Sequence, residues 1–265
     1  MGIITLTTDF GSRDYFAGAM KGVIKNINAA ADIIDISHEI PSHDVWAAAY
    51  TIASTYRFYP RSTIHLAVVD PGVGSARRPI LVCSDNQYFI GPDNGIFSFV
   101  YESPDFSRVI HITAEHYALP VTGSTFHARD IFAPAAAWLS KGLDSYNFGD
   151  EITDYVKFNL HPAKTEGGNI LLGEVVYIDK FGNCITNVTG DDINRFMETS
   201  GLNKFRMQVK DTMIERISDF YAGVERGTAG TVINGNGFIE LFVYQGSAAK
   251  LLGLKRGDPV RYLFG

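Results

Sequence analysis

Residues 63–74, Thr63-Ile64-His65-Leu66-Ala67-Val68-Val69-Asp70-Pro71-Gly72-Val73-Gly74, combine an apolar run with a carboxylate and a glycine turn. The run predicts a buried strand that ends at Asp70. A charged side chain at the end of such a strand, beside glycines that let a ligand approach the backbone, is typical of sites in open α/β sheets. Asp, Pro and Gly are also ordinary turn formers. Both interpretations stay open on this segment alone.

The residues around this segment alternate between strand-like and helix-like patterns, which predicts an N-terminal three-layer α/β domain of the Rossmann-like kind. An amphipathic helix carries Phe16, Met20, Val23 and Ile27, and further helices are expected at Val45–Tyr56 and Ile131–Lys141. The expected strands are Ile3–Thr8, Asp32–Ser37, Thr63–Val69, Pro79–Ser84, Gln87–Gly91 and Arg108–Thr113.

A change of pattern after about residue 160 predicts a second domain. Residues 161–168 are rich in linker-type residues, so we expect residues 1–160 to form the α/β domain and 169–265 a small C-terminal β-barrel. Short alternating runs separated by glycine turns indicate the barrel. Examples are Asn169–Ile178, Phe205–Val209 and Gly237–Tyr244.

Three further stretches carry candidate site residues. Asp9 follows the first strand, where a carboxylate can accept both hydroxyls of a ribose; Ser12 and Asp14 lie nearer the next helix and would cap it better. His127, at the start of a predicted helix, is a candidate base or orienting group, although helix-entry histidines also serve as caps. The polar segment Tyr177–Asn187 predicts a hairpin turn.

Composition excludes several function classes. The chain has 265 residues, 46% hydrophobic and 20% charged, with a net charge of -6, which argues against a nucleic-acid partner. No apolar run reaches membrane-spanning length, and only two cysteines are present, so we expect a cytoplasmic protein without membrane association. The histidines lack paired metal-ligand spacing and no dinucleotide fingerprint is complete, so neither metal nor cofactor is expected.

Together, the stretches resemble the S-adenosylmethionine hydrolases that form adenosine, also called S-adenosylmethionine hydroxide adenosyltransferases, which are related to the fluorinase and chlorinase enzymes. The likeness spans nearly the whole chain, and the order of the motifs makes it specific. The motifs are Thr8-Asp9-Phe10-Gly11, Val69-Asp70-Pro71-Gly72-Val73-Gly74, Gly91-Pro92-Asp93-Asn94-Gly95, Phe126-His127-Ala128-Arg129-Asp130, Asp179-Lys180-Phe181-Gly182-Asn183 and Gly246-Ser247-Ala248-Ala249.

The resemblance implies a catalytic triad of Asp70, Arg77 and His127 around a water that attacks the 5′ carbon of the ribose, so that methionine leaves and adenosine remains. In the halogenases the position matching Asp70 is not acidic, so Asp70 favours water as the nucleophile. Arg77 would keep the carboxylate of Asp70 ionised. Which of Asp70 and His127 takes the proton stays open. The alternatives are a chlorinase-like enzyme that uses halide and a non-catalytic sensor of S-adenosylmethionine or adenosine.

The resemblance also implies the substrate contacts. Asp9 would bind the ribose, Asp179 the methionine ammonium, and Phe181 and Asn183 the nucleoside end. Asn234 is placed with them, although Gly235 and Asn236 stand where relatives often carry serine followed by arginine or an aromatic residue. A homotrimer with its sites at subunit interfaces is implied as well.

Overall fold

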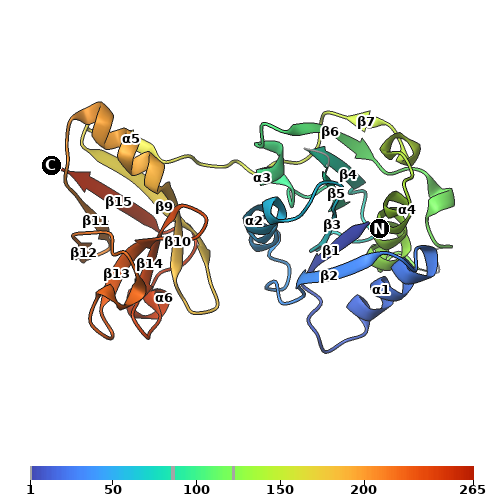
Figure 1. Ribbon diagram of the computed structural model, residues 1–265, viewed down its shortest axis with the longest axis horizontal. Coiled ribbons are helices and arrows are strands. Elements are labelled where there is room, and N and C mark those ends of the chain that lie inside the picture. The colour runs from blue at the N-terminus through green and yellow to red at the C-terminus, as the bar shows by residue number, and fades with distance from the viewer. Residues whose placement is uncertain (1, 85–86, 121–122) are drawn as a thin grey trace. The chain divides into compact units, whose positions relative to one another are not determined.

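The structure is a computed structural model that describes residues 2–84, 87–120 and 123–265 (Figure 1). The chain divides into two compact units, residues 1–159 and 160–265, and each unit has its own sheet and its own hydrophobic core. The division falls next to the segment expected as a linker, residues 161–168. Within that segment Lys164–Glu166 forms a short strand, β8, which pairs with the first long strand of the second unit.

A mixed seven-stranded sheet forms the centre of the first unit, in the order β2-β1-β3-β5-β4-β6-β7. The strands β2, β1, β3 and β5 run parallel, whereas β4, β6 and β7 pair antiparallel. The six strands expected from the sequence are all present, with ends that differ by a few residues. The six are β1 (Ile3–Thr8), β2 (Asp32–Ser37), β3 (Ile64–Val68), β4 (Pro79–Ser84), β5 (Gln87–Pro92) and β6 (Phe106–His111). A short seventh strand, β7 (Glu151–Ile152), was not expected.

Helices cover both faces of this sheet, which confirms the predicted three-layer α/β class (Figure 1). On one face α1 (Phe16–Ile27) packs against α4 (Ala133–Ser140), and on the other α2 (Val45–Thr55) packs against α3 (Ser98–Tyr101). A π-helical turn, Ala128–Phe132, leads into α4. Short 3-10 turns occupy Tyr56–Phe58, Glu115–Tyr117, Ser145–Phe148 and Tyr221–Gly223.

The second unit is an antiparallel, nearly closed barrel, as the sequence predicted. Its strands follow the order β12-β11-β15-β9-β10-β14-β13. Ile217 forms a bridge with Thr231 of β13, and Ser218 donates its N–H to the Thr231 carbonyl over 2.7 Å, which brings the two ends of the sheet together. The bounds are β9 (Ile170–Ile178), β10 (Cys184–Thr189), β11 (Phe205–Val209), β12 (Thr212–Ile214), β13 (Ala229–Ile233), β14 (Phe238–Val243) and β15 (Pro259–Phe264).

Two helices that the sequence analysis did not expect accompany the barrel, α5 (Gly190–Ser200) and α6 (Ala248–Leu251). A capping box starts α5: Thr189 accepts the Asp192 N–H, and Asp192 accepts the Thr189 N–H. Ile193 is buried on the inner side of α5, and Phe196 stacks on Phe264 of β15 with ring centroids 4.2 Å apart. The capping box and this apolar face together explain why the segment is helical.

His65 is a buried histidine in the middle of β3. Its side chain stacks on Phe89 with ring centroids 4.9 Å apart, and its Nδ1 lies 2.8 Å from the Thr5 hydroxyl. Only 4% of the residue is exposed, and this burial lowers its pKa to about 4. His65 is therefore neutral in the folded protein at pH values where an unfolded chain would hold a proton on it.

This difference predicts loss of stability in mild acid. Because the pKa of His65 is about 4 when folded and about 6.5 when unfolded, only the unfolded chain gains the proton as the pH falls through this interval. We expect the His65 contribution to lower the free energy of unfolding by roughly 2 kcal/mol between pH 7 and pH 4.5.

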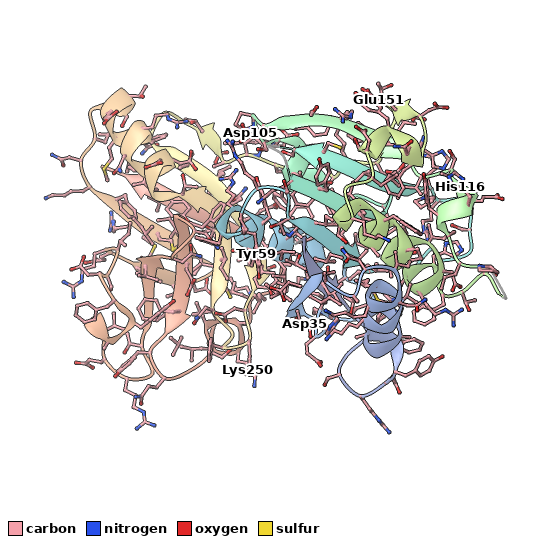
Figure 2. All side chains as sticks on the ribbon, turned by 45° about the vertical axis from the view of Figure 1, so that its right-hand side comes forward. Asp35, Tyr59, Asp105, His116, Glu151 and Lys250 are labelled. Carbon is pink, nitrogen blue, oxygen red and sulfur yellow. The ribbon has the colours of Figure 1, made fainter. Side chains whose placement is uncertain are left out.

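The free energy of unfolding, measured with urea at several pH values across this range, should depend less steeply on pH in His65→Gln than in the wild type. His116, an exposed histidine, provides the matched control His116→Gln (Figure 2). Equal pH slopes for all three proteins would contradict the assignment.

Candidate functional site

Two carboxylates emerge at one edge of the first sheet. Strands β1 and β3 are parallel neighbours with Thr8 opposite Val68, so Asp9 and Asp70 follow the same ends of adjacent strands. Both line a cavity of about 410 Å³, and His127 lines it as well. The sheet order thus brings together three of the predicted site residues that are far apart in the sequence.

Arg77 joins Asp70 to His127. Its Nε donates to Oδ1 of Asp70 over 3.0 Å, and its Nη2 donates to Oδ2 of the same carboxylate. Nη2 also lies 2.8 Å from Nδ1 of His127. The side chains of Asp70 and Arg77 are only 5% and 8% exposed, and the guanidinium carbon lies 5.2 Å from the centre of the Phe132 ring. Burial removes competing water, so this two-pronged ion pair fixes both side chains.

The Arg77 contact assigns the protons of His127. A guanidinium only donates, so Nδ1 of His127 must accept and the neutral ring carries its proton on Nε2. Burial lowers the pKa of His127 below its ordinary value, and the charge of Arg77 lowers it further, although Asp70 and Asp130 act in the opposite direction. The imidazole is therefore neutral near neutral pH, with Nε2–H as a donor.

The loop after β3 is shaped by Gly74. Its φ is +80°, and a Cβ there would lie 2.8 Å from the carbonyl oxygen of Ser124. Only glycine allows the two loops to approach this closely. The Asn94 amide supports the strand end by donating to the Val69 carbonyl over 2.9 Å. These contacts keep Arg77 beside the start of the π-helical turn that follows His127.

The wall of the cavity is acidic and aromatic. Asp9 accepts the backbone N–H of His43 over 2.9 Å, and exposed His43, with a φ of +66°, lines the cavity beside it. The rings of Phe10, Phe16 and Phe126 contact one another with centroids 5.3–6.2 Å apart. An acidic cavity with flat apolar walls suits a cation that carries an aromatic group.

Asp14 also lines this cavity, a role that the sequence analysis missed. The expectation that Ser12 or Asp14 caps α1 is wrong. The N-cap residue is Tyr15, and no side chain caps this end of the helix. Tyr15 already has helical backbone angles, so the chain enters the helix after both polar residues. Asp14 adds a third carboxylate to the cavity. Its place in the loop between β1 and α1, the same loop that carries Asp9, was the available signal for this role.

The predicted residues Asp179, Phe181 and Asn183 lie in the hairpin turn between β9 and β10, as expected for this segment. Oδ1 of Asp179 accepts the backbone N–H groups of Phe181 and Asn183 over 2.9 and 2.8 Å, and Oδ2 accepts the Asn183 amide over 3.0 Å. Asn183 is buried and its amide nitrogen is used within the turn, whereas Phe181 is 72% exposed. The turn therefore presents the Phe181 ring.

Asn234 lies in the turn between β13 and β14. Its Oδ1 accepts the backbone N–H groups of Asn236 and Phe238 over 3.0 and 3.2 Å, and its Nδ2 donates to Glu240 over 3.3 Å. Glu240 also accepts the Tyr221 hydroxyl over 2.8 Å. The sequence analysis missed Glu240 and Tyr221. The available signal for Glu240 was a carboxylate inside the apolar run Phe238–Val243.

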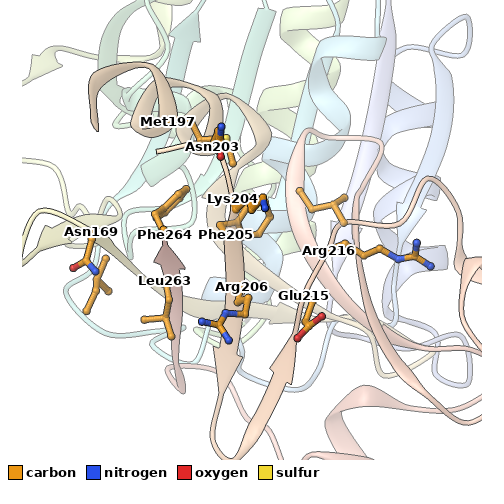
Figure 3. Close-up of a pocket in the computed structure, with 13 residues that line it drawn as sticks. Asn169, Met197, Asn203, Lys204, Phe205, Arg206, Glu215, Arg216, Leu263 and Phe264 are labelled. Atoms are coloured by element: carbon orange, nitrogen blue, oxygen red, sulfur yellow. The ribbon is translucent and has the colours of Figure 1, made fainter. Parts of the chain in front are cut away.

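The predicted residues thus form one group in each unit. Asp9, Asp70, Arg77 and His127 belong to the first, and the four substrate-binding candidates Asp179, Phe181, Asn183 and Asn234 belong to the second. A larger cavity of about 830 Å³ lies in the second unit, where Phe205, Phe264 and the basic residues Lys204, Arg206 and Arg216 line it (Figure 3). None of the predicted site residues is among those that line it.

The described part of the chain has neither a cluster of metal-ligating side chains nor a membrane-spanning helix. In residues 2–84, 87–120 and 123–265, no group of three or more His, Cys, Asp or Glu side chains is arranged to hold a metal ion. Over the same residues, every helix is too short or too polar to cross a membrane.

Known proteins resemble this chain over almost its full length. A hydrolase of Methanocaldococcus jannaschii named (R)-S-adenosyl-L-methionine hydrolase is 34% identical, over 99% of this chain and 96% of its own. A Thermus thermophilus protein of the same name is also 34% identical, over 97% of both chains. The crystal structure of a conserved Thermotoga maritima protein superposes with a TM-score of 0.87 at 31% identity, over 99% of this chain and 100% of its own.

Family descriptions match both units of the chain. Residues 4–149 match the SAM hydroxide adenosyltransferase N-terminal domain, and residues 173–261 match the C-terminal domain of the same family. The first match includes Asp9, Asp70, Arg77 and His127, and the second includes the hairpin turn and Asn234. The chain belongs to the SAM hydroxide adenosyltransferase family.

Proposed function

We propose that this protein hydrolyses S-adenosylmethionine to adenosine and methionine. The contact of Asp70, Arg77 and His127 beside a cavity that also holds Asp9 is the observation that carries the proposal. The names of the relatives support the same reaction. No cofactor is needed, because the substrate already contains its leaving group.

The chemistry requires a water molecule that is aimed and deprotonated. Its oxygen forms a bond to the 5′ carbon of the ribose, the bond from that carbon to sulfur breaks, and the sulfur keeps the electron pair as a neutral thioether. Because a sulfonium leaves without protonation, no acid is required on the methionine side. The protein must hold the water in line with the departing sulfur and accept one proton.

The contacts of Arg77 support a division of roles within the triad. His127 cannot accept at Nδ1, which is already bonded to Arg77, so its Nε2–H orients the water as a donor. Asp70 is then the base, because its carboxylate retains lone pairs beyond the two that bind Arg77. Arg77 has a further buried donor, Nη1, without a partner among the described residues, and this N–H can hold the developing hydroxide.

The remaining candidates would bind the substrate. Asp9 binds the ribose hydroxyls, for which a carboxylate beside the cavity is suited. Asp179 binds the methionine ammonium: a carboxylate offers about four lone-pair sites, and the turn bonds leave room for a cation. Exposed Phe181 packs against the nucleoside, and Asn183 and Asn234 contribute amide groups.

We further propose that the protein acts in the cytoplasm as a homotrimer with its sites at subunit interfaces. The free cysteines Cys83 and Cys184 are consistent with a reducing compartment. The two groups of candidate residues belong to separate compact units, so a substrate bound by both groups requires two units to meet. In a trimer these units would come from neighbouring chains.

Product analysis tests the proposed reaction. Incubation of the purified protein with each sulfonium epimer of S-adenosylmethionine should give adenosine and methionine in equal amounts, faster with the (R) epimer for which the relatives are named. The incubations contain chloride, and a boiled sample is the control. A 5′-chloro nucleoside would indicate a halide-using enzyme, and binding without turnover would indicate a sensor.

The triad is tested by isosteric substitution. Asp70→Asn removes the base, and we expect kcat to fall at least about 10³-fold while the Kd for S-adenosylmethionine, measured by calorimetry, changes less than about threefold. His127→Ala should behave similarly. Asp105→Asn, at an exposed carboxylate that does not line the cavity, is the matched control (Figure 2). Full turnover by Asp70→Asn would rule out the assigned role.

Light scattering tests the oligomeric state. On a size-exclusion column with light-scattering detection, the measured mass should be about three times the 29.2 kDa of one chain. The Asp70→Asn variant should give the same mass. A monomeric mass in a protein that hydrolyses the substrate would show that one chain is sufficient.

A further inference from the structure

Glu240 is a buried carboxylate at the centre of a polar group in the second unit. It lies in β14 between apolar neighbours and is only 4% exposed. Its two partners are neutral: Oε1 accepts the hydroxyl of Tyr221 over 2.8 Å, and Oε2 accepts the amide of Asn234 over 3.3 Å. A buried carboxylate costs folding free energy unless it is both hydrogen-bonded and paired with a cation, and neither Tyr221 nor Asn234 is a cation. This arrangement is therefore costly for a barrel wall.

Asn234 can present only one side of its amide to Glu240. Its Oδ1 is held by the backbone N–H groups of Asn236 and Phe238, so a flip of the amide would break both turn bonds. Nδ2 must therefore point toward Glu240. The carboxylate in turn fixes the side chain of Asn234, and with it the turn between β13 and β14.

Tyr221 is held at both ends. Its ring meets Phe242 edge-on, with centroids 5.0 Å apart and planes at 89°, and its hydroxyl is bonded to Glu240. The residue nevertheless remains 45% exposed. An exposed ring that is fixed in this way loses little entropy when a ligand covers it.

Asp179 belongs to the same neighbourhood. Burial raises the pKa of Glu240, and the negative charge of Asp179 raises it further. Asp179 likewise contributes to the raised pKa of Tyr221. One substrate-binding candidate, Asn234, is thus bonded to Glu240, and another, Asp179, is close enough to act on it electrostatically.

We propose that Glu240 is a positioning residue for substrate binding, which holds the Asn234 amide and the Tyr221 ring in the arrangement that receives S-adenosylmethionine. The proposal rests on the proposed function and adds to it a residue that lies behind the binding surface. Glu240 acts through Asn234 and Tyr221, so its loss weakens binding more than it slows the chemical step.

The test uses two variants that break different bonds. Glu240→Gln keeps the size of the side chain but replaces one of its two acceptor oxygens by an NH2 group, so it cannot accept from both the Tyr221 hydroxyl and the Asn234 amide. Tyr221→Phe removes only the hydroxyl and leaves Asn234 in place. Glu225→Gln, an exposed glutamate of the same unit, is the control.

We expect Glu240→Gln to raise the KM for S-adenosylmethionine and the Kd for adenosine about tenfold, with kcat within about twofold of the wild type. Tyr221→Phe should raise both about threefold, and Glu225→Gln should change neither. Thermal unfolding of each variant accompanies the kinetics. A lower Tm for Glu240→Gln with unchanged KM and Kd would reduce Glu240 to a structural residue and overturn the proposal.

The readouts also separate this proposal from the proposed function. If the wild type forms no adenosine from S-adenosylmethionine, the proposed function fails, but calorimetry with adenosine still compares the variants. If Glu240→Gln does not fold, Tyr221→Phe decides: unchanged adenosine binding in that variant would overturn the positioning role. A wild type that binds neither compound would refute both.

Discussion

The double hydrogen bond from Arg77 to Asp70 is the constraint around which the first unit is arranged. The ion pair is buried, so each of the two side chains holds the other in one orientation. The same guanidinium also contacts Nδ1 of His127. The neighbouring parallel strands β1 and β3 bring Asp9 to the same edge, and Gly74 lets the Arg77 loop approach the segment before His127 closely. Displacement of the guanidinium would release Asp70 and His127, because a buried charge does not tolerate the loss of its partner.

The second unit carries groups of a different kind. Its candidate residues lie in turns of a barrel, where a backbone bend is fixed by side chains rather than by helices. Asp179 accepts three bonds within its own turn, and Asn234 accepts two within its turn. Such turns hold their polar atoms in place before a ligand arrives, which reduces the entropy lost on binding.

The sequence was sufficient for the fold class, because the apolar runs of β1, β3 and β4 are long and bounded by turn residues. It was also sufficient to place Asp9 and Asp70 at strand ends, where parallel topology makes them neighbours. The link to His127 came from the family resemblance, since no local pattern reports a contact between residues 77 and 127. The start of α1 was misjudged because several polar residues competed for it, and α5 was missed because its capping box stands among strands. Glu240 escaped notice because no sequence pattern reports its hydrogen bonds to Tyr221 and Asn234, which depend on how the barrel strands and turns fold.

The permanent charge of Arg77 fixes the protonation state of His127. Because the guanidinium occupies Nδ1 of His127, the imidazole cannot take up a proton there without expelling its neighbour. A fall of a few tenths of a pH unit near neutrality therefore leaves this ring in the same state. The Nε2–H of His127 is therefore a donor whose presence does not vary with pH near neutrality.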